Sequence, residues 1–188
     1  LFPASPALAK LEGTKFEAPP AVKAKKLGAA EYPVSLYSMV SANFLMEEAR
    51  KGNVKGIIYC QSNMVGGYSN PTELESILES VPFSVDIDVQ MTDTAKCCKY
   101  VLPDTTFLER DDLPWSFSYN TPCLTLRSKV LDVIHPNTKP VQDITVELAK
   151  ACGVGKYFDF TLDELAEAQL EPTGVTLQEL RDIGSIDY

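Results

Sequence analysis

Residues 83–103 read FSVDIDVQMTDTAKCCKYVLP, and this stretch decides the fold class. An apolar run ends at Asp88, a threonine-rich turn follows, and a second apolar run closes at Pro103. Short apolar runs bounded by turn residues are typical of buried strands. Between the two runs, Thr92 or Asp93 is a favourable N-cap for a short helix. The stretch therefore predicts a strand, a helix and a second strand.

The same alternation extends towards the N-terminus. VKGIIYC at residues 54–60 predicts a buried strand that ends in a long Gly-rich loop. Ser69 or Asn70, with Pro71 in the first turn, then caps a predicted helix through TELESILES. Three strands joined by two helices form a βαβαβ unit, and helical crossovers imply parallel strands. We therefore predict an α/β fold with a Rossmann-like parallel sheet flanked by helices.

The remaining residues divide around this unit. Residues 1–33 are rich in proline and predict an irregular arm, whereas residues 35–50 predict a helix. Beyond Pro103, aromatic and β-branched stretches predict short extra strands, and residues 143–153 predict a further helix. The predicted organisation is an arm over 1–33, one α/β domain over 34–160 and a helical tail over 161–188.

Composition excludes several classes of function. The 188 residues are 45% hydrophobic and 23% charged, which is typical of a globular protein large enough for one sizeable core. The formal net charge of -9 and the pI near 4.6 argue against a general nucleic-acid binder, because binding to phosphate backbones needs a basic surface. No apolar run approaches the roughly 18 residues of a membrane span, so we expect no direct membrane insertion.

Cysteine usage argues against a metal site within the chain. The five cysteines are odd in number and irregularly spaced, no C-x-x-C occurs, and His135 is the only histidine. Such a pattern is neither a disulfide framework nor a set of zinc or iron-sulfur ligands. We expect buried or incidental thiols.

The candidate site lies at the ends of the predicted strands. In open parallel sheets, ligands bind beyond the carboxyl ends of the strands. At that edge Asp88 could accept two hydrogen bonds from a ribose, and Thr92 and Thr94 could cap the helix or reach a phosphate. The spacing leaves open that Asp88 is only a cap or turn residue. The acidic and basic run 109–112 is likewise more typical of a solvated charge cluster than of a site.

Three motifs carry a family resemblance. DVQMTDTAKCCKYVLPDTTFLERDD at residues 88–112 resembles a segment of the molybdopterin oxidoreductases, the dimethyl sulfoxide reductase family. YCQSNMVGGYSNP resembles that family's strand-loop region upstream, and KPVQDITVELAKACG resembles its stretch with an Asp before L-A-x-x-x-G. The motifs follow the family's order over residues 55–153. The L-E-R-D-D form is similar to that of polysulfide and thiosulfate reductase-like members.

The resemblance implies a cofactor-binding α/β domain from the middle of a larger catalytic subunit. In that family, the domain binds one guanine nucleotide arm of the bis(molybdopterin guanine dinucleotide) cofactor, which carries molybdenum or tungsten. The residues implied in cofactor binding are Ser62, Asn63, Asp88, Thr92, Arg110 and Asp143.

Each of these residues has an implied role. Ser62 and Asn63 would lie in the loop that touches the nucleotide, and Asp88 would hold the ribose. Arg110 would lie near the cofactor. Asp143 would pair with the guanine edge, because a carboxylate accepts from N1–H and N2–H together.

The chain also departs from the family pattern. Cys98-Lys99 stands where Ala-Asp is common, the usual G-x-N-P is loosened around residues 62–71, and Asp112-Leu113 replaces a frequent glycine. The family's metal ligand and its iron-sulfur cysteine cluster lie upstream of the segment resembled, and nothing in the chain matches them. We therefore expect no catalytic or metal-ligating residue here, and an iron-sulfur cluster only in the N-terminal part of such a subunit.

The functional hypothesis is a fragment of a molybdenum or tungsten oxidoreductase that is inactive alone. Its partner would be the rest of the catalytic subunit, which acts on a sulfur or oxyanion substrate, or formate. Iron-sulfur electron-transfer and membrane-anchor subunits are common partners in the family, whose members are either cytoplasmic or exported. The alternative is a stand-alone α/β nucleotide-binding or regulatory module without catalysis. A NAD-dependent dehydrogenase domain is disfavoured, since no G-x-G-x-x-G follows the first strand.

Overall fold

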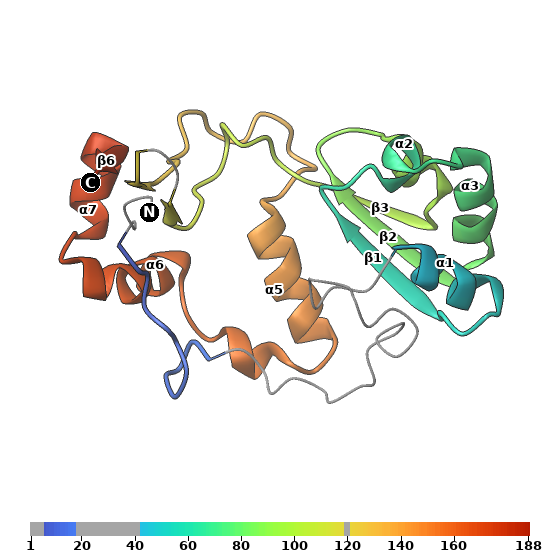
Figure 1. The fold of residues 1–188 in the computed structure, drawn as a ribbon, viewed down its shortest axis with the longest axis horizontal. Helices are drawn as coiled ribbons and strands as arrows, with labels where there is room; N and C mark the ends of the chain where they lie inside the picture. Colours follow the sequence, from blue (N-terminus) through green and yellow to red (C-terminus); the bar gives the residue numbers. More distant parts are fainter. Residues whose placement is uncertain (1–5, 18–41, 119–120) are drawn as a thin grey trace. The chain divides into compact units, whose positions relative to one another are not determined.

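A computed structural model of the chain describes residues 6–17, 42–118 and 121–188 (Figure 1). These residues form two compact units. The first, called here the sheet unit, comprises residues 42–104 and 137–141; the second, the C-terminal unit, comprises 6–17, 105–118, 121–136 and 142–188. This division by packing does not follow the predicted boundaries at residues 33 and 160, and those boundaries stay a prediction about function.

The sheet unit contains the predicted βαβαβ core. Its elements are α1 (Ala42–Arg50), β1 (Gly56–Cys60), α2 (Met64–Gly67), α3 (Pro71–Ser80), β2 (Phe83–Asp88), α4 (Asp93–Cys97) and β3 (Tyr100–Pro103). The three strands pair in parallel in the order β1-β2-β3, with Tyr59 opposite Asp86 and Asp88 opposite Pro103. The predicted α/β class and parallel sheet are confirmed.

Local sequence signals account for most of these boundaries. Asn70 caps α3 by accepting from the Glu73 N–H at 3.4 Å, and Thr92 caps α4 by accepting from the Ala95 N–H at 3.1 Å. Of the helix predicted over 35–50, residues 42–50 are helical, and residues 35–41 lie outside the described ranges. The predicted long loop after β1 is wrong in one respect, because its residues 64–67 form the short helix α2.

One face of the sheet packs against helices α1 and α3, which lie beside it in Figure 1. The buried side chains of this core are Met46, Ala49, Tyr59, Val65, Leu74, Ile77, Leu78 and Val81. Residues that alternate to the other face include Ile58, which is 56% exposed, and the ring pair Phe83 and Tyr100 at 5.6 Å. The core of the sheet unit therefore lies on its helical side.

The C-terminal unit combines helices with a small antiparallel sheet. Its elements are β4 (Trp115–Phe117), β5 (Cys123–Thr125), α5 (Val141–Ala151), η1 (Gly155–Phe158), α6 (Leu162–Leu170), η2 (Glu171–Thr173), α7 (Leu177–Ile183) and β6 (Ser185–Asp187). The sheet order is β4-β5-β6. The last strand, β6, has no counterpart in the sequence prediction. It pairs with β5 and brings the end of the chain onto the core of this unit.

Two capping boxes fix the final helices. Thr161 and Glu164 at the start of α6, and Thr176 and Glu179 at the start of α7, exchange reciprocal side-chain and backbone hydrogen bonds. Leu170 and Leu180 of these helices, together with Leu124 of β5, are buried in one cluster (other members: Leu126, Ala166 and Leu177). The predicted helical segments of residues 161–188 therefore pack directly on the small sheet.

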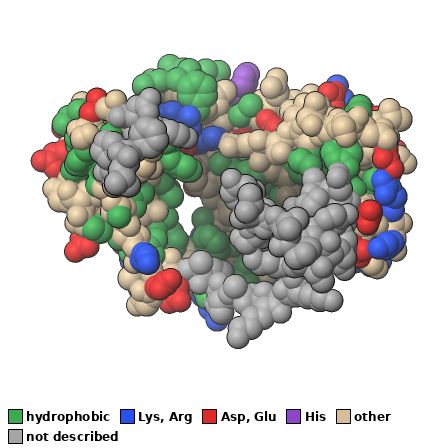
Figure 2. Space-filling view, in the orientation of Figure 1, with side chains coloured by type: hydrophobic (Ala, Val, Ile, Leu, Met, Phe, Trp, Pro, Cys, Tyr) green, Lys and Arg blue, Asp and Glu red, His purple; other side chains and the backbone are tan. Residues whose placement is uncertain are grey.

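The surface and the thiols complete the description. Figure 2 shows hydrophobic side chains in several green patches between acidic and basic ones on the visible face. No cysteine is buried: Cys60 and Cys152 are exposed and the other three are half-buried, so of the two expected alternatives, buried or incidental thiols, the structure does not support burial. Cys60 is the last residue of β1 and Cys152 directly follows α5, so the two exposed thiols lie at the ends of these elements. None of the helices described is both long and apolar enough to cross a bilayer.

Leu74→Ala tests the core of the sheet unit. The Leu74 side chain is 0% exposed, and its truncation should lower the free energy of unfolding by about 2–5 kcal/mol through lost burial and a residual cavity. Ile58→Ala, at a 56% exposed position, is the matched control and should cost less than about 1 kcal/mol. Urea denaturation followed by circular dichroism measures both; equal losses would contradict the assignment of the core.

Candidate functional site

The carboxyl ends of β1, β2 and β3 meet at one edge of the sheet because the strands are parallel. Asp88 is the last residue of the central strand and is half-buried. Its Oδ1 accepts a hydrogen bond from the Val89 N–H at 2.6 Å, and this carboxylate makes no other hydrogen bond to the described residues. Asp88 therefore presents acceptor capacity at the edge of the sheet.

Gln61 connects the ends of the two outer strands. It directly follows β1, and its Nε2 donates to Asp104 Oδ2 at 2.7 Å, just beyond β3. Its backbone N–H donates to the Ile87 carbonyl at 2.8 Å. Gln61 has φ = 52°, in the left-handed region that L-residues rarely adopt, so the chain turns sharply away from the sheet here.

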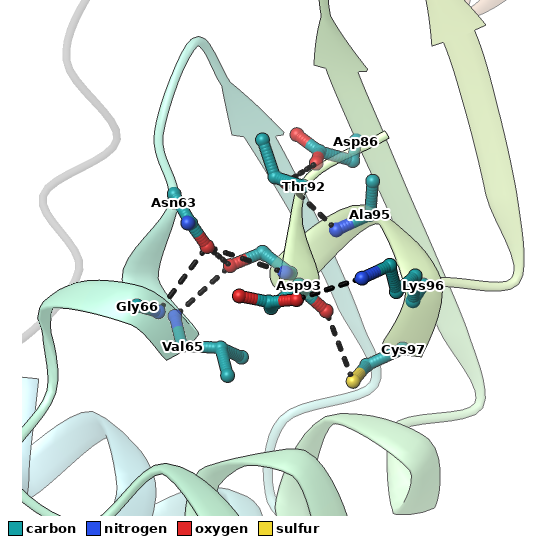
Figure 3. A network of polar contacts seen from close by, with 10 residues as sticks. Asn63, Val65, Gly66, Asp86, Thr92, Asp93, Ala95, Lys96 and Cys97 are labelled. Carbon is teal, nitrogen blue, oxygen red and sulfur yellow. Dashed lines mark hydrogen bonds and ion pairs between the residues drawn. The ribbon is translucent and has the colours of Figure 1, made fainter. Parts of the chain in front are cut away.

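The bonds between Asn63 and Thr94 hold the loop after β1 against α4; Figure 3 shows Asn63 beside Gly66 and Val65 of this loop. Asn63 Oδ1 accepts from the Thr94 hydroxyl at 3.2 Å, and also from the Gly66 N–H at 3.2 Å, which caps α2. The Thr94 hydroxyl in turn accepts from the Val65 N–H at 3.0 Å. Because Thr94 is 0% exposed, these bonds form a buried cross-link between the two strand-end loops.

The glycine pair in this loop does not provide an unusual backbone conformation. Neither Gly66 nor Gly67 has a positive φ, so neither is needed for an unusual backbone conformation. A Cβ at Gly66 would instead lie 2.5 Å from Asn63 Nδ2. Gly66 therefore permits the close approach of the Asn63 cap.

Thr92 and Asp86 form a second polar contact at the same edge (Figure 3). The Thr92 hydroxyl accepts from the Ala95 N–H at 3.1 Å and donates to Asp86 Oδ2 at 3.3 Å. Asp86 lies inside β2 with 0% exposure, and its Oδ1 has no hydrogen-bond partner among the described residues. Burial raises the pKa of the Asp86 carboxyl above 3.8; the Thr92 hydrogen bond opposes this and the charge of Asp88 adds to it.

The structure brings four of the six predicted site residues to this edge: Ser62, Asn63, Asp88 and Thr92. Ser62 is half-buried, and its hydroxyl makes no hydrogen bond to the described residues. Asn63 and Thr92 are largely committed to the protein by the bonds above, and Thr94 is wholly so. Ser62 and Asp88 remain the residues with capacity for a ligand.

Arg110 belongs to the C-terminal unit and is only 7% exposed. Its Nη1 donates to the Thr105 carbonyl at 3.0 Å, and its Nε lies 3.5 Å from Asp112 Oδ1. The neighbouring Glu109 is also buried and accepts from the Thr106 and Ile134 N–H groups, which lower its pKa. The expectation of a solvated charge cluster at 109–112 is therefore wrong, because two of its four side chains are buried and three of them bond to backbone groups.

Asp143 also belongs to the C-terminal unit. It lies in the first turn of α5, where a carboxylate is favoured by the helix dipole, and its side chain is exposed. It makes no hydrogen bond or ion pair with the described residues, so both of its oxygens can accept from a ligand.

Sequence reasoning gave no role to three contributors to the edge: Gln61, Asp86 and Asp104. A signal existed for one of them. The pattern D-I-D at residues 86–88 places two carboxylates on the same face of β2, and a carboxylate within an apolar strand requires a polar partner. No local signal identifies the bond between Gln61 and Asp104, which are 43 residues apart.

Across the described ranges, no group of three or more His, Cys, Asp and Glu side chains is arranged to hold a metal ion. The carboxylates and hydroxyls of the edge are suited to accept hydrogen bonds from the hydroxyl and amino groups of a nucleoside.

Comparison with known proteins places the chain in a larger enzyme class. No family model matches it. It is 33% identical over 136 residues to the probable oxidoreductase YyaE of Bacillus subtilis, covering 71% of this chain and 20% of that protein. It is 29% identical over 161 residues to the assimilatory nitrate reductase catalytic subunit of the same organism, covering 79% and 22%.

Two further matches are informative. The thiosulfate reductase molybdopterin-containing subunit PhsA of Salmonella typhimurium is 26% identical over 136 residues, covering 72% of this chain and 18% of that one. The solved structure of acetylene hydratase from Pelobacter acetylenicus matches with a TM-score of 0.68 and 24% identity, covering 79% of this chain and 21% of that one, and supports the fold.

The fold and these relatives define the class: an α/β region whose curated relatives are named as a probable oxidoreductase, a nitrate reductase catalytic subunit and a molybdopterin-containing subunit. The chain belongs to the molybdopterin oxidoreductase family, as its motifs indicated. It spans about a fifth of the length of the curated relatives that it matches.

Thr94→Val tests the cross-link at the sheet edge. The substitution keeps the shape of the side chain but leaves the buried Val65 N–H without its acceptor, so the free energy of unfolding should fall by about 1–3 kcal/mol. Hydrogen exchange at the Val65 amide should accelerate. Thr72→Val, at an exposed position of α3, is the control. Slow exchange at Val65 in Thr94→Val would show that the cross-link is dispensable.

Proposed function

We propose that the chain binds one guanine dinucleotide arm of a bis(molybdopterin guanine dinucleotide) cofactor within the catalytic subunit of a molybdenum or tungsten oxidoreductase. One observation carries this proposal. Asp88, at the carboxyl end of the central strand, uses one oxygen to accept from the Val89 N–H and has acceptor capacity left, and the Ser62 hydroxyl at the same edge is also unengaged. This is the position and chemistry that a ribose diol requires.

The polar groups of the edge fit a nucleoside better than a bare anion. Asp88 is anionic and repels phosphate, but it accepts strongly from ribose hydroxyls. Ser62 can donate or accept, and Asn63 retains its amide nitrogen because its oxygen is committed to Thr94 and Gly66. Nucleotide binding here therefore depends on sugar and base contacts, with the phosphates directed away from Asp88.

Asp143 is proposed to bind the guanine base. Its exposed carboxylate at the first turn of α5 makes no bond to the described residues, and guanine offers N1–H and N2–H as a parallel pair of donors. Arg110 is proposed to lie near the cofactor, and its bonds to the Thr105 carbonyl and Asp112 fix its guanidinium.

The chain's own contribution is binding and orientation. When bound, the cofactor supplies oxygen-atom, sulfur or electron-pair transfer at its metal. The metal ligand and the iron-sulfur cluster are proposed to belong to other parts of the catalytic subunit, so these 188 residues alone would be inactive. The proposed partners are the rest of that subunit and, in a multi-subunit enzyme, electron-transfer and membrane-anchor subunits.

Cofactor content tests the proposal directly. Molybdenum, tungsten and released guanine nucleotide are measured per polypeptide in the native full-length protein, purified without oxygen. The expected result is about one metal and two guanine nucleotides, the ratio of a bis-dinucleotide cofactor. A native protein that carries neither metal nor guanine nucleotide would favour the stand-alone nucleotide-binding or regulatory module.

Asp88→Asn should reduce retained guanine nucleotide about tenfold, because a charged acceptor is replaced by a neutral one of the same size. The control is Asp132→Asn, whose side chain is 98% exposed. The thermal midpoint of Asp88→Asn should stay close to that of the control. A collapse of the midpoint, with normal nucleotide per folded molecule, would mean that Asp88 is only a turn residue.

Asp143→Ala should lower guanine nucleotide retention at least about fivefold, because both acceptors for the guanine edge are removed. Glu147→Ala, at an exposed carboxylate on the same helix, controls for charge and helix propensity. Selectivity provides a second readout: Asp143→Ala should lose its preference for guanosine over inosine, which lacks N2–H. Unchanged retention and preference would refute this role.

A further inference from the structure

Asp86 is the one buried carboxylate of β2, and it lies behind the proposed nucleotide site. It is 0% exposed, and its only hydrogen-bonded side chain is that of Thr92, which is half-buried. Figure 3 shows one carboxylate oxygen directed at the Thr92 hydroxyl and the other directed away from it. Oδ1, the second oxygen, has no partner among the described residues.

The Thr92 hydroxyl has one hydrogen to donate and two lone pairs to accept with. One lone pair accepts from the Ala95 N–H at 3.1 Å and thereby caps α4. When Asp86 is ionised, it can only accept, so the Thr92 hydrogen must point at Asp86 Oδ2, 3.3 Å away. In that state Thr92 has no hydrogen left for an acceptor atom of a ligand.

Protonation of Asp86 reverses this bond. A proton on Oδ1 would be a buried donor without an acceptor, whereas a proton on Oδ2 can be donated to the second lone pair of Thr92. The Thr92 hydrogen is then released towards the half-exposed side of the residue. The cap to Ala95 is kept in both states.

We propose that Asp86 is a positioning residue that sets the direction of the Thr92 hydroxyl, so that Thr92 donates to a ligand oxygen only when Asp86 is protonated. This inference rests on the proposed nucleotide site and adds to it a buried residue that controls one of its hydrogen-bond donors. The ligand group concerned is an acceptor oxygen of a phosphate or ribose.

The surroundings favour the protonated form of Asp86. Three titratable side chains lie around the Asp86 carboxyl. Asp88 lies on the same face of β2, the buried Tyr59 is the residue of β1 paired with Asp86, and Cys98 follows α4. Burial, with the charges of Cys98 and Asp86, raises the pKa of Tyr59 to about 12, so Tyr59 is a neutral neighbour. No basic side chain of the described residues acts on the Asp86 carboxyl. Its pKa is raised, so the protonated form persists above 3.8.

The sign of the pH effect follows from this shift. Because the folded-state pKa of Asp86 lies above its ordinary value, the folded protein holds the proton over the window between the two. The stability that Asp86 contributes is fully present below 3.8 and is lost as the pH rises through the folded-state pKa. Donation by Thr92 should be lost over the same rise in pH.

A ligand-free measurement tests the bond reversal. Carboxyl ¹³C shifts of the full-length protein give the titration of Asp86, and the Ala95 amide shift reports on the Thr92 oxygen to which it donates. The Ala95 amide should titrate with the pKa of Asp86, and Asp86→Asn should abolish that titration. An Ala95 amide that ignores the Asp86 titration overturns the proposal, whether or not any nucleotide binds.

Binding of guanosine diphosphate, measured by calorimetry from pH 4 to pH 8 in roughly half-unit steps, tests the consequence. Affinity of the wild-type protein should fall about threefold to tenfold as Asp86 ionises. This fall is counted in addition to the change measured with Asp86→Asn. That variant is the control, because the phosphate of guanosine diphosphate titrates in the same way with both proteins. Thr92→Val keeps the Asp86 charge but has no hydroxyl, and its profile should lack most of the fall.

The outcomes separate the two proposals. An equally steep profile in Thr92→Val would mean that Asp86 acts through its charge alone, which overturns the role of the hydroxyl. Thr92→Ser, which keeps the hydroxyl, should restore the wild-type profile. Absence of guanosine diphosphate binding at every pH, with a normal Ala95 titration, would sink the proposed nucleotide site and, with it, the ligand half of this inference.

Discussion

The parallel pairing of β1, β2 and β3 is the constraint on which the polar edge depends. Because all three strands point the same way, residues that are far apart in sequence must leave the sheet side by side, as Gln61 and Asp104 do at 2.7 Å. The chain then has to turn at three adjacent points without leaving backbone groups unsatisfied. Asn63, Thr92 and Thr94 meet this need with side-chain oxygens. The Ser62 hydroxyl and one oxygen of Asp88 are not used for this purpose.

This division of labour leaves one strand-end carboxylate available to a ligand. Asp86, Asp88 and Asp104 lie in or just after β2 and β3, and only Asp88 is not buried. Asp104 is buried and accepts from Gln61, and Asp86 is buried with a raised pKa. Asp88 alone is half-exposed. The edge therefore offers one ionised acceptor for hydroxyl groups, while the two buried carboxyls serve the protein itself.

The parts of the fold that were predictable from sequence are those with local signals. The strand ending at Asp88 and the caps at Asn70 and Thr92 each follow from short-range chemistry, and all are present. The helix α2 was missed because its four residues include two glycines, and the bonds that tie it to Thr94 come from a residue 29 to 31 positions away along the chain. The strand β6 was missed because its three residues gain their partner only in the folded chain.

The site shows the same boundary between local and long-range information. Sequence comparison identified positions, but it could not separate side chains that are available from those that are committed. Asn63 and Thr94 look alike as polar residues near the strand ends, yet the Thr94 side chain is buried and donates its hydroxyl to the Asn63 oxygen. Arg110 looked solvated within a run of charges and is 7% exposed. Commitment of this kind depends on tertiary contacts, which motifs do not encode.

Gln61 has to satisfy two requirements of this edge, a left-handed backbone and a side chain that reaches Asp104. Its φ of 52° costs an L-residue about 1–2 kcal/mol, which glycine would avoid. Glycine, however, has no side chain to reach Asp104, and asparagine, which tolerates this backbone region, is one methylene shorter. At position 61 the backbone conformation favours glycine or asparagine, whereas the hydrogen bond to Asp104 requires the longer side chain of glutamine. Few residue types should therefore be accepted at position 61, and a substitution there should be tolerated best when residue 104 changes with it.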